Sequence, residues 1–208
     1  MFITMEGPDG SGKSRQLAAL VVFLRDQGHQ VLATREPGGT AIGDQVRDIL
    51  ATLGNTSMQA RTEILLFQAS RAQLVDQVIM PGLKRGGIVV CDRYADSTLA
   101  YQGYGHRVDL EELRVIVNFA TQGLKPDLTL LLDIDVSEGL KRKARGGEWN
   151  RLDAYDLEFH ERVRQGYHKM ASEEPERWEI IDGGGTIEQV QSAIRAVVVK
   201  RLKERQAG

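Results

Sequence analysis

A glycine-rich stretch near the start of the chain, GPDGSGKS, has the residue types needed to hold phosphate groups. It matches the pattern G-x-x-x-x-G-K-[ST], and it lies between a short apolar run and an amphipathic stretch, as this motif requires. Backbone N–H groups of such a loop surround phosphates, the lysine reaches the outer ones, and the serine hydroxyl is a ligand for Mg²⁺. The predicted nucleotide site comprises Gly7, Pro8, Asp9, Gly10, Ser11, Gly12, Lys13 and Ser14. The motif leaves the phosphoryl acceptor open, because GTPases, ATPases and kinases share it.

A second pair of charged residues follows the apolar run IVVC. Asp92 lies where a carboxylate could hold the Mg²⁺ shell, through a water molecule. Arg93 would then point into the same crevice, where a guanidinium can contact a phosphate through two hydrogen bonds. A salt bridge at the end of a strand is the alternative interpretation of this pair.

Two further groups of residues could recognise a nucleobase. Phe67 and Arg71 are four apart in a predicted helix and therefore share a face, where a ring can stack on a base while a guanidinium reads its edge. Thr98 and Gln102 are also four apart, with Tyr101 between them, and their polar groups could bond to a base edge. Taken alone, the first pair is more typical of a core residue beside a surface residue, and the second is more typical of an exposed polar helix surface.

The segment KRKARGGEWNRLD, at positions 141–153, is basic and contains glycines. It lies between two predicted helical stretches. These features predict a mobile lid whose arginines close over transferring phosphates. A solvated basic loop is the alternative.

Apolar runs and amphipathic stretches alternate along the whole chain, which predicts an α/β fold with a five-stranded parallel sheet and helices on both faces. We expect one domain over residues 1–208, with ligands at the carboxyl ends of the strands, where the motifs occur. The predicted strands are 2–5, 30–33, 88–92, 128–134 and 178–182. The predicted helices are 13–27, a stretch ending at 53, 57–84, 96–123 and a C-terminal one with an apolar face from 187 to 202.

Composition narrows the class of protein. The chain has 208 residues, of which 41% are hydrophobic and 27% charged, and its formal net charge of -2 argues against a general nucleic-acid or membrane-surface binder. The single cysteine, Cys91, excludes an intrachain disulfide and a multi-cysteine zinc site, and we expect it to be buried. The stretch MFITMEG is unlike a signal peptide, and no apolar run approaches the ~20 residues of a membrane span, so we expect a cytoplasmic protein.

The order of the motifs EGPDGSGKS, TREPGGT, LLFQASR, CDRYADSTLAYQG, LKPDLTLLLD and KARGGEWNRLD resembles that of the thymidylate kinases, from residue 2 to about residue 167. The resemblance implies a P-loop nucleoside-monophosphate kinase, usually a homodimer. Such an enzyme transfers the γ-phosphate of ATP, with Mg²⁺, to dTMP and so makes dTDP for dTTP synthesis.

The resemblance also implies which residues bind the phosphate and sugar of dTMP. Arg93 and Arg47 would hold the phosphate, and Glu36 would lie near it and near Mg²⁺. Pro37 would shape this loop through a cis bond. Asp9 would serve the region of the sugar 3′-OH.

On the thymine side, the resemblance places Phe67 against the face of the base and Arg71 at its edge. Thr98 and Gln102 match positions that read the base. Tyr101 matches a tyrosine packed where a ribose 2′-OH would lie, which favours the deoxy sugar.

One position departs from part of the family. Some members have an arginine in the phosphate loop where this chain has Gly10, so the lid must supply that positive charge. Arg142, Arg145 and Arg151 are available, and the sequence leaves open which of them reaches the transition state. We assign Arg145 and Arg151 to catalysis, with Lys13 and Arg93, and Arg142 to ATP binding.

Two alternatives remain at this stage. The first is a kinase for another deoxynucleotide or for a deoxynucleoside. The second, from a different class, is a P-loop switch or a non-catalytic nucleotide-binding module. A guanine-reading N-K-x-D motif, which would favour a GTPase-like switch, does not occur in the sequence.

Overall fold

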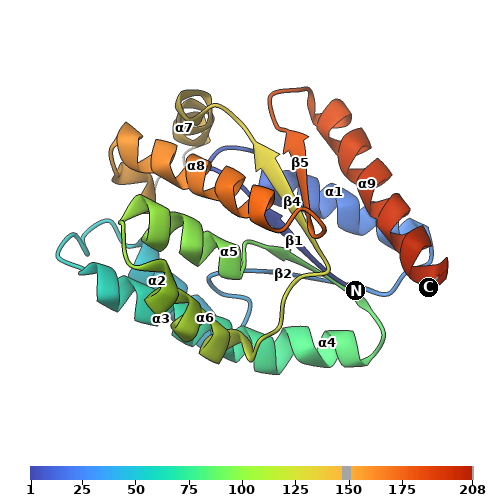
Figure 1. The fold of residues 1–208 in the computed structure, drawn as a ribbon, viewed down its shortest axis with the longest axis horizontal. Helices are drawn as coiled ribbons and strands as arrows, with labels where there is room; N and C mark the ends of the chain where they lie inside the picture. Colours follow the sequence, from blue (N-terminus) through green and yellow to red (C-terminus); the bar gives the residue numbers. More distant parts are fainter. Residues whose placement is uncertain (147–150, 208) are drawn as a thin grey trace.

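The computed structural model describes residues 1–146 and 151–207. Within these residues, a parallel sheet with the strand order β2-β3-β1-β4-β5 forms the centre of the molecule (Figure 1). Its strands are β1 (Phe2–Glu6), β2 (Val31–Arg35), β3 (Ile88–Asp92), β4 (Leu128–Asp133) and β5 (Trp178–Asp182). The predicted α/β fold with five parallel strands is therefore confirmed.

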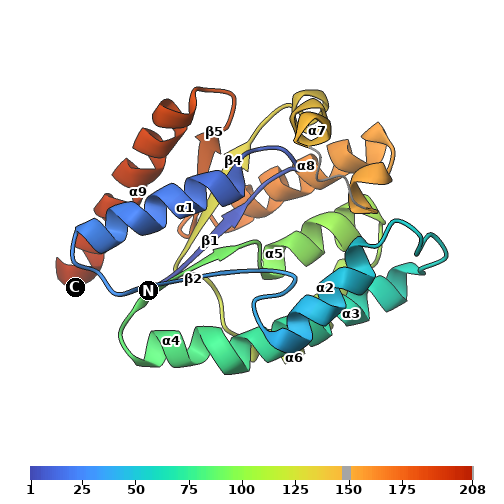
Figure 2. The same ribbon diagram turned by 180° about the vertical axis from the view of Figure 1, so that it is seen from behind.

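Helices cover both faces of the sheet (Figures 1 and 2). The α-helices are α1 (Lys13–Asp26), α2 (Ala41–Ala51), α3 (Ala60–Leu74), α4 (Met80–Lys84), α5 (Ala95–Thr98), α6 (Leu110–Thr121), α7 (Val136–Arg145), α8 (Leu157–Glu173) and α9 (Ile187–Ala207). Two π-helical segments, Val75–Ile79 and Leu99–Gly105, continue α3 and α5, and a 3-10 turn spans Leu152–Ala154. None of the helices described in these two ranges has the length and apolar composition needed to cross a membrane.

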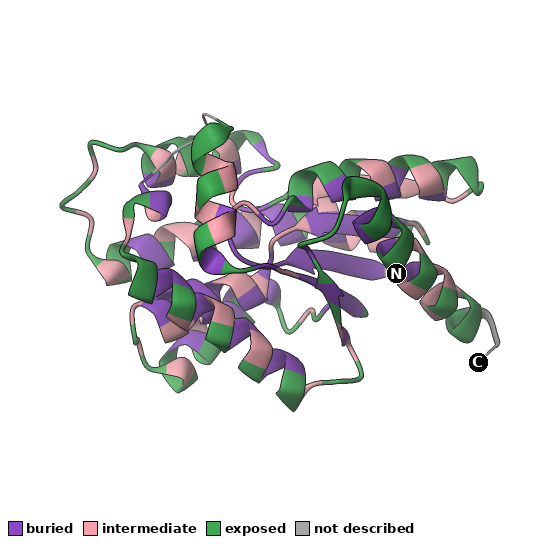
Figure 3. Cartoon of the chain, turned by 90° about the horizontal axis from the view of Figure 1, so that it is seen from above, coloured by how far each residue is buried: buried purple, intermediate pink, exposed green. Residues whose placement is uncertain are grey.

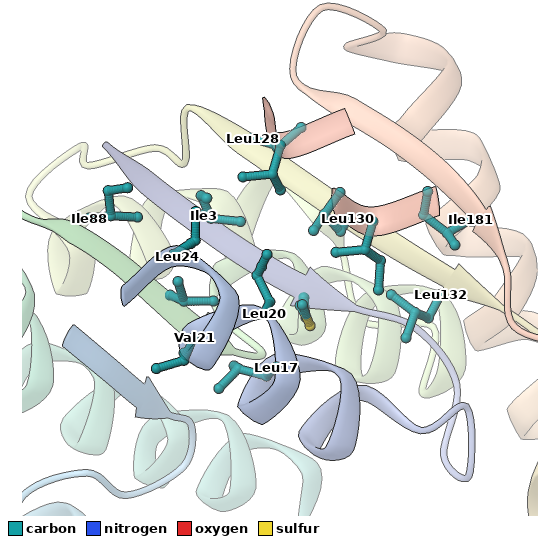
Figure 4. Close-up of a cluster of buried hydrophobic side chains, with 14 of the residues drawn as sticks. Ile3, Leu17, Leu20, Val21, Leu24, Ile88, Leu128, Leu130, Leu132 and Ile181 are labelled. Carbon is teal, nitrogen blue, oxygen red and sulfur yellow. The ribbon is translucent and has the colours of Figure 1, made fainter. Parts of the chain in front are cut away.

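The apolar periodicity of α1 explains one layer of the core. Leu17, Leu20 and Leu24 lie on one face of this helix and pack against Ile3 of β1 and Leu130 of β4 (Figure 4). Helix α9 contributes its own apolar face to the same cluster. On the opposite face of the sheet, α8 and the end of α3 pack in two further clusters.

The central strands are apolar without alternation because both of their faces are covered. Figure 3 shows them in the buried class, whereas the outer faces of the helices are exposed. Cys91 of β3 is fully buried, as expected. Because β1 lies between β3 and β4, the loops that follow these three strands emerge at the same edge of the sheet.

Some predicted boundaries were wrong. Strand β2 extends to Arg35 rather than ending at residue 33. The predicted helix 96–123 is divided, because Asp109 accepts hydrogen bonds from the N–H groups of Glu111 and Glu112 and so caps a new helix, α6. The first five residues of the predicted lid, 141–145, are the end of α7 rather than a loop, and residues 147–150 of the lid lie outside the described residues.

Candidate functional site

A cavity of about 380 Å³ opens at the carboxyl ends of the strands, where the phosphate loop, the loop after β2, α3 and the segment after β3 meet. It brings together most of the residues selected from the sequence: Asp9, Gly10, Gly12, Lys13, Ser14, Glu36, Pro37, Arg47, Phe67, Arg71, Asp92, Arg93, Thr98, Tyr101, Gln102 and Arg142. Among the predicted residues that the structure describes, Gly7, Pro8, Ser11, Arg145 and Arg151 do not line it.

The phosphate loop joins β1 directly to α1. Gly7 and Gly12 adopt positive φ angles of 138° and 87°, and a Cβ atom on Gly7 would lie 2.3 Å from the carbonyl oxygen of Leu132. The Lys13 ammonium folds back into the loop, where Nζ donates to the carbonyl oxygens of Gly7 (2.9 Å) and Pro8 (2.7 Å). Burial and, next, the charge of Arg93 lower the pKa of Lys13 to about 8. The loop therefore places a partly desolvated cation at the start of a helix, where an anion is also favoured by the helix dipole.

Oxygen atoms suited to a divalent cation come from the start of α1 and from the end of β3. Ser14, at the start of α1, donates its hydroxyl to Oδ2 of Asp92, at the end of β3, over 2.5 Å. Within residues 1–146 and 151–207 there is no cluster of three or more His, Cys, Asp or Glu residues that could hold a metal. The pair fits Mg²⁺, which commonly takes one or two protein oxygens and completes its shell with water and phosphate oxygens.

The acid in the phosphate loop is paired with Arg93. Asp9 accepts a hydrogen bond from Nη2 of Arg93 (2.8 Å) and another from the hydroxyl of Tyr101 (2.5 Å). Burial by itself would raise the pKa of Asp9, but Arg93 and then Lys13 hold this pKa well below its usual range. Arg93 has a φ of 65°, a left-handed conformation that is uncommon outside glycine and often occurs at functional sites.

Glu6 is a residue of this site that the sequence analysis missed. Its side chain is fully buried at the end of β1, where it accepts hydrogen bonds from the backbone N–H of Tyr94 (2.7 Å), the Ser97 hydroxyl (2.6 Å) and the Tyr167 hydroxyl (2.9 Å). Burial and, next, the charge of Asp96 raise the pKa of Glu6 to about 7. The only signal in the sequence is a carboxylate that directly follows the short apolar run before the loop.

Arg71 is enclosed by protein groups at the inner end of the cavity. Its side chain is 1% exposed. Nε and Nη2 contact Oε2 of Glu36 at 2.8 and 2.7 Å, Nη1 donates to Gln68 and Thr98, and Nη2 also donates to the carbonyl oxygen of Tyr94. Each of its three nitrogens therefore has a protein acceptor. The other carboxylate oxygen of Glu36, Oε1, is buried and has no partner among the described residues.

The other residues that the sequence analysis assigned to dTMP line the same cavity as Arg71. Phe67, one helical turn before Arg71 on α3, lines the cavity with a half-buried ring. Gln102 is buried, and its amide donates to Oε1 of Glu63 over 2.7 Å. Arg47 of α2 donates to the carbonyl oxygen of Pro37 over 3.1 Å, and the Glu36–Pro37 peptide bond is cis, as expected.

The predicted lid arginines have three different environments. Arg142 lines the cavity and donates to Glu138 and to the carbonyl oxygen of Gly183. Arg145 is exposed at the end of α7. Arg151 is buried, and its guanidinium forms an ion pair with Glu63.

Direct packing explains why Gly10 carries no side chain. A Cβ atom at this position would lie 1.9 Å from the carbonyl oxygen of Gly139 in α7, and a Cβ atom on Gly139 would lie 2.4 Å from the carbonyl oxygen of Asp9. The phosphate loop and α7 are thus in backbone contact, which leaves no room for an arginine at position 10. The cations that α7 contributes to the cavity lining are Arg142 and Lys143.

Comparisons with known proteins agree with this geometry. A family model described as thymidylate kinase matches residues 5–194. The thymidylate kinase of Roseiflexus sp. (strain RS-1) is 52% identical over 210 residues, which cover 95% of this chain and 93% of that protein. The thymidylate kinase of Deinococcus radiodurans is 48% identical over 201 residues, which cover 97% of each chain. The crystal structure of thymidylate kinase from Ehrlichia chaffeensis superposes with a TM-score of 0.78 at 33% identity, over 95% of this chain and 97% of that one.

Proposed function

The chain belongs to the thymidylate kinase family, and we propose that its cavity holds ATP and dTMP together for direct transfer of the γ-phosphoryl group. It is an ATP-dependent nucleoside-monophosphate kinase that phosphorylates dTMP to dTDP. The main support for this proposal is that a single cavity is lined both by the phosphate loop and by residues assigned to dTMP, namely Phe67, Arg93 and Arg47.

On the donor side, we assign the phosphates of ATP to the loop and to the start of α1. Phosphate oxygens would replace the carbonyl oxygens of Gly7 and Pro8 as acceptors for the Lys13 ammonium. Ser14 directly, and Asp92 through a water molecule, would hold Mg²⁺, which when bound supplies positive charge to the phosphate oxygens. Arg142, beside the loop after β5, is assigned to the ATP end of the cavity.

On the acceptor side, we assign the dTMP phosphate to Arg93 and Arg47, with Glu36 and Pro37 forming the loop beneath it. The attacking atom is an oxygen of the dTMP phosphate, so no protein nucleophile is required, and catalysis rests on position and positive charge. Asp9 is assigned to the sugar 3′-OH, an acceptor role that its Arg93-stabilised carboxylate fits.

The thymine base is assigned to the part of the cavity between α3 and the segment after β3. Phe67 would stack on the ring, and Arg71, Thr98 and Gln102 would lie at its edge. Tyr101, held by Asp9, would occupy the space of a ribose 2′-OH and so favour the deoxy sugar.

We propose that the chain is a single kinase domain with a lid at residues 141–153. Arginines of this lid would stabilise negative charge that develops on the phosphate oxygens in the transition state. Arg145 is exposed, whereas Arg151 would have to break its ion pair with Glu63 before it could contact a phosphate oxygen. Closure of the lid would exclude water and so suppress hydrolysis of ATP.

We also propose that the enzyme is a homodimer and that it acts in the cytoplasm. Apolar side chains stand exposed on two packed helices, Leu65 of α3 and Val115 and Phe119 of α6. Phe119 is 85% exposed. Such a patch is typical of a surface that a second protein chain covers.

The experiment that tests the function is a coupled assay of ADP release with dTMP, dUMP, dCMP or thymidine as acceptor. We expect ADP formation to depend on the acceptor and to be fastest with dTMP. Turnover of thymidine at an equal or higher rate would favour a deoxynucleoside kinase instead. ADP release that does not depend on dTMP would contradict the assignment of the acceptor site.

The lowered pKa of Lys13 predicts an alkaline limit to ATP use. Because this pKa is about 8 in the free protein, the ammonium is fully charged below that pH and is lost as the pH rises through it. We expect kcat/KM for ATP, which reports the free enzyme, to fall above about pH 8. The limit on kcat should lie at higher pH, because bound phosphates favour the charged amine. A kcat/KM for ATP that stays constant from pH 7 to 9.5 would show that Lys13 does not titrate there.

Replacing Phe67 by alanine tests the stacking role. We expect the affinity for dTMP to fall by ~1–3 kcal/mol, the range measured for base–aromatic stacking, while the KM for ATP stays unchanged. Isothermal titration with dTMP measures the loss. Thr62→Ala, on the same helix but exposed and outside the cavity lining, is the matched control. Unchanged dTMP affinity would mean that the ring is only part of the cavity wall.

A further inference from the structure

The carboxylate of Glu6 is not used by the chemistry described above, yet it is joined to Arg93 through two hydroxyl groups. Nη1 of Arg93 lies 3.3 Å from the Ser97 hydroxyl and 3.1 Å from the Tyr167 hydroxyl. The same two hydroxyls lie 2.6 and 2.9 Å from Oε2 of Glu6. Three chain segments, β1, α5 and α8, therefore meet at one carboxylate oxygen behind the arginine.

The direction of each hydrogen bond follows from the chemistry of the two ends. A guanidinium can only donate, and an ionised carboxylate can only accept. Each hydroxyl has one hydrogen. The two hydroxyl oxygens also lie 2.9 Å from each other, so an ionised Glu6 takes the hydrogen of at least one hydroxyl, and the other hydrogen goes either to Glu6 or to that first hydroxyl. In each of these arrangements both oxygens present lone pairs to Arg93. A neutral group with its own N–H or O–H at position 6 would face either the backbone N–H of Tyr94, which would lose its acceptor, or the two hydroxyls, at least one of which would have to turn its hydrogen towards another partner.

We propose that Glu6 is a positioning residue: its carboxylate orients the hydroxyls of Ser97 and Tyr167 as acceptors for Nη1 of Arg93, which leaves the guanidinium aimed at the phosphate of dTMP. This inference rests on the proposed role of Arg93. Nη2 of Arg93 is held by Asp9 and Tyr101 on its other side, so the guanidinium has fixed partners on both edges. A long side chain that is fixed before its ligand arrives loses less conformational freedom on binding.

The side-chain contacts of Glu6 lie away from the phosphate loop, whereas its backbone leads into Gly7, whose carbonyl oxygen also accepts from Nη1 of Arg93 over 3.1 Å. The carboxylate oxygens contact Tyr94, Ser97 and Tyr167, and none of these residues belongs to the phosphate loop. The backbone N–H of Tyr94, bound by Oε1, immediately follows Arg93 in the chain. Glu6 thus holds both the backbone and the side-chain partners of the arginine.

The test is the Glu6→Gln variant, which keeps the shape of the side chain but adds an N–H₂ donor. We expect the Kd for dTMP, measured at about pH 8, to rise roughly tenfold, the loss typical of a hydrogen bond to a charged group. The KM for ATP should stay unchanged. Asp127→Asn is the matched control, because Asp127 accepts from the N–H of Phe2 at the opposite end of the same strand, and we expect it to bind dTMP as the unaltered protein does.

A double-mutant cycle decides whether the effect passes through Arg93. In an Arg93→Ala background, Glu6→Gln should cause no further loss of dTMP affinity, because there is no guanidinium left to position. If the tenfold loss persists in that background, or if ATP binding weakens as much as dTMP binding, Glu6 is structural and the proposal is overturned. The proposal is also overturned if the single variant Glu6→Gln binds dTMP as tightly as the unaltered protein.

A second variant keeps the proposal testable if Glu6→Gln does not fold. Tyr167→Phe removes one hydroxyl and retains the ring packing. It should weaken dTMP binding selectively and, like Glu6→Gln, lose its effect in the Arg93→Ala background; equal dTMP affinity would contradict the proposal. If the unaltered enzyme shows no dTMP-dependent ADP release, the proposed function itself fails, and that result is distinct from either outcome above.

Discussion

Lys13→Ala should lower the turnover number roughly 10²- to 10³-fold and leave dTMP affinity nearly unchanged. The expected size is that of removing one preorganised donor from a site where charge develops in the transition state. Lys13 lies in the loop, and its ammonium contacts loop oxygens rather than the residues assigned to dTMP. Steady-state kinetics with both substrates, together with titration of dTMP, measure the two effects.

The control for Lys13→Ala is another cation on the same helix. Arg25 lies in the last turn of α1 and donates to the carbonyl oxygen of Val31, far along the helix from the loop. Arg25→Ala should therefore keep its turnover. Near-normal turnover of Lys13→Ala would refute the assigned role of the lysine, whereas equal losses in both variants would indicate a general effect on α1.

Arg71→Met should lower the free energy of unfolding by about 3–5 kcal/mol, because it leaves the buried carboxylate of Glu36 without its cation. The side chains of this pair are 1% and 3% exposed. Burial raises the pKa of Glu36, and Arg71 opposes that rise. Without the arginine, the carboxyl group should become protonated more readily in the folded state. The loss of unfolding free energy caused by Arg71→Met should therefore be largest at neutral pH and shrink as the pH falls towards 5. Chemical denaturation at both pH values measures this difference.

A double variant separates the loss of a charge pair from the loss of packing. Arg71→Met combined with Glu36→Gln removes both buried charges, and we expect it to recover much of the lost stability. If Arg71→Met instead keeps full stability and loses only dTMP affinity, then the guanidinium contributes mainly to binding the edge of the base and little to the stability of the fold. The sequence analysis assigned Arg71 to the base alone, because its contact with Glu36, 35 residues away in the chain, has no local signal.

The sequence by itself determined the fold class, the strands within one or two residues at most boundaries, and the group of residues that meet in the cavity. The fold class and the strands depend on local information, whereas several cavity residues, among them Glu36, Pro37 and Arg47, were assigned from the resemblance to a known family. Apolar runs specify covered strands, the spacing of Leu17, Leu20 and Leu24 specifies a helix face, and the residues Gly12, Lys13 and Ser14 specify a phosphate loop. Because all the strands are parallel, motifs that follow different strands must also meet at one edge.

Only the tertiary structure decided which of those residues are free to act and which are held by others. Arg151 follows a basic segment and was assigned to catalysis, yet its ion pair with Glu63 joins residues 88 apart in the chain. Glu6 is linked to Tyr167 across 161 residues, and Gly10 meets a backbone oxygen of α7. The physical reason is that a buried charge must find partners wherever packing brings them, and packing between distant segments leaves no periodic trace in the sequence.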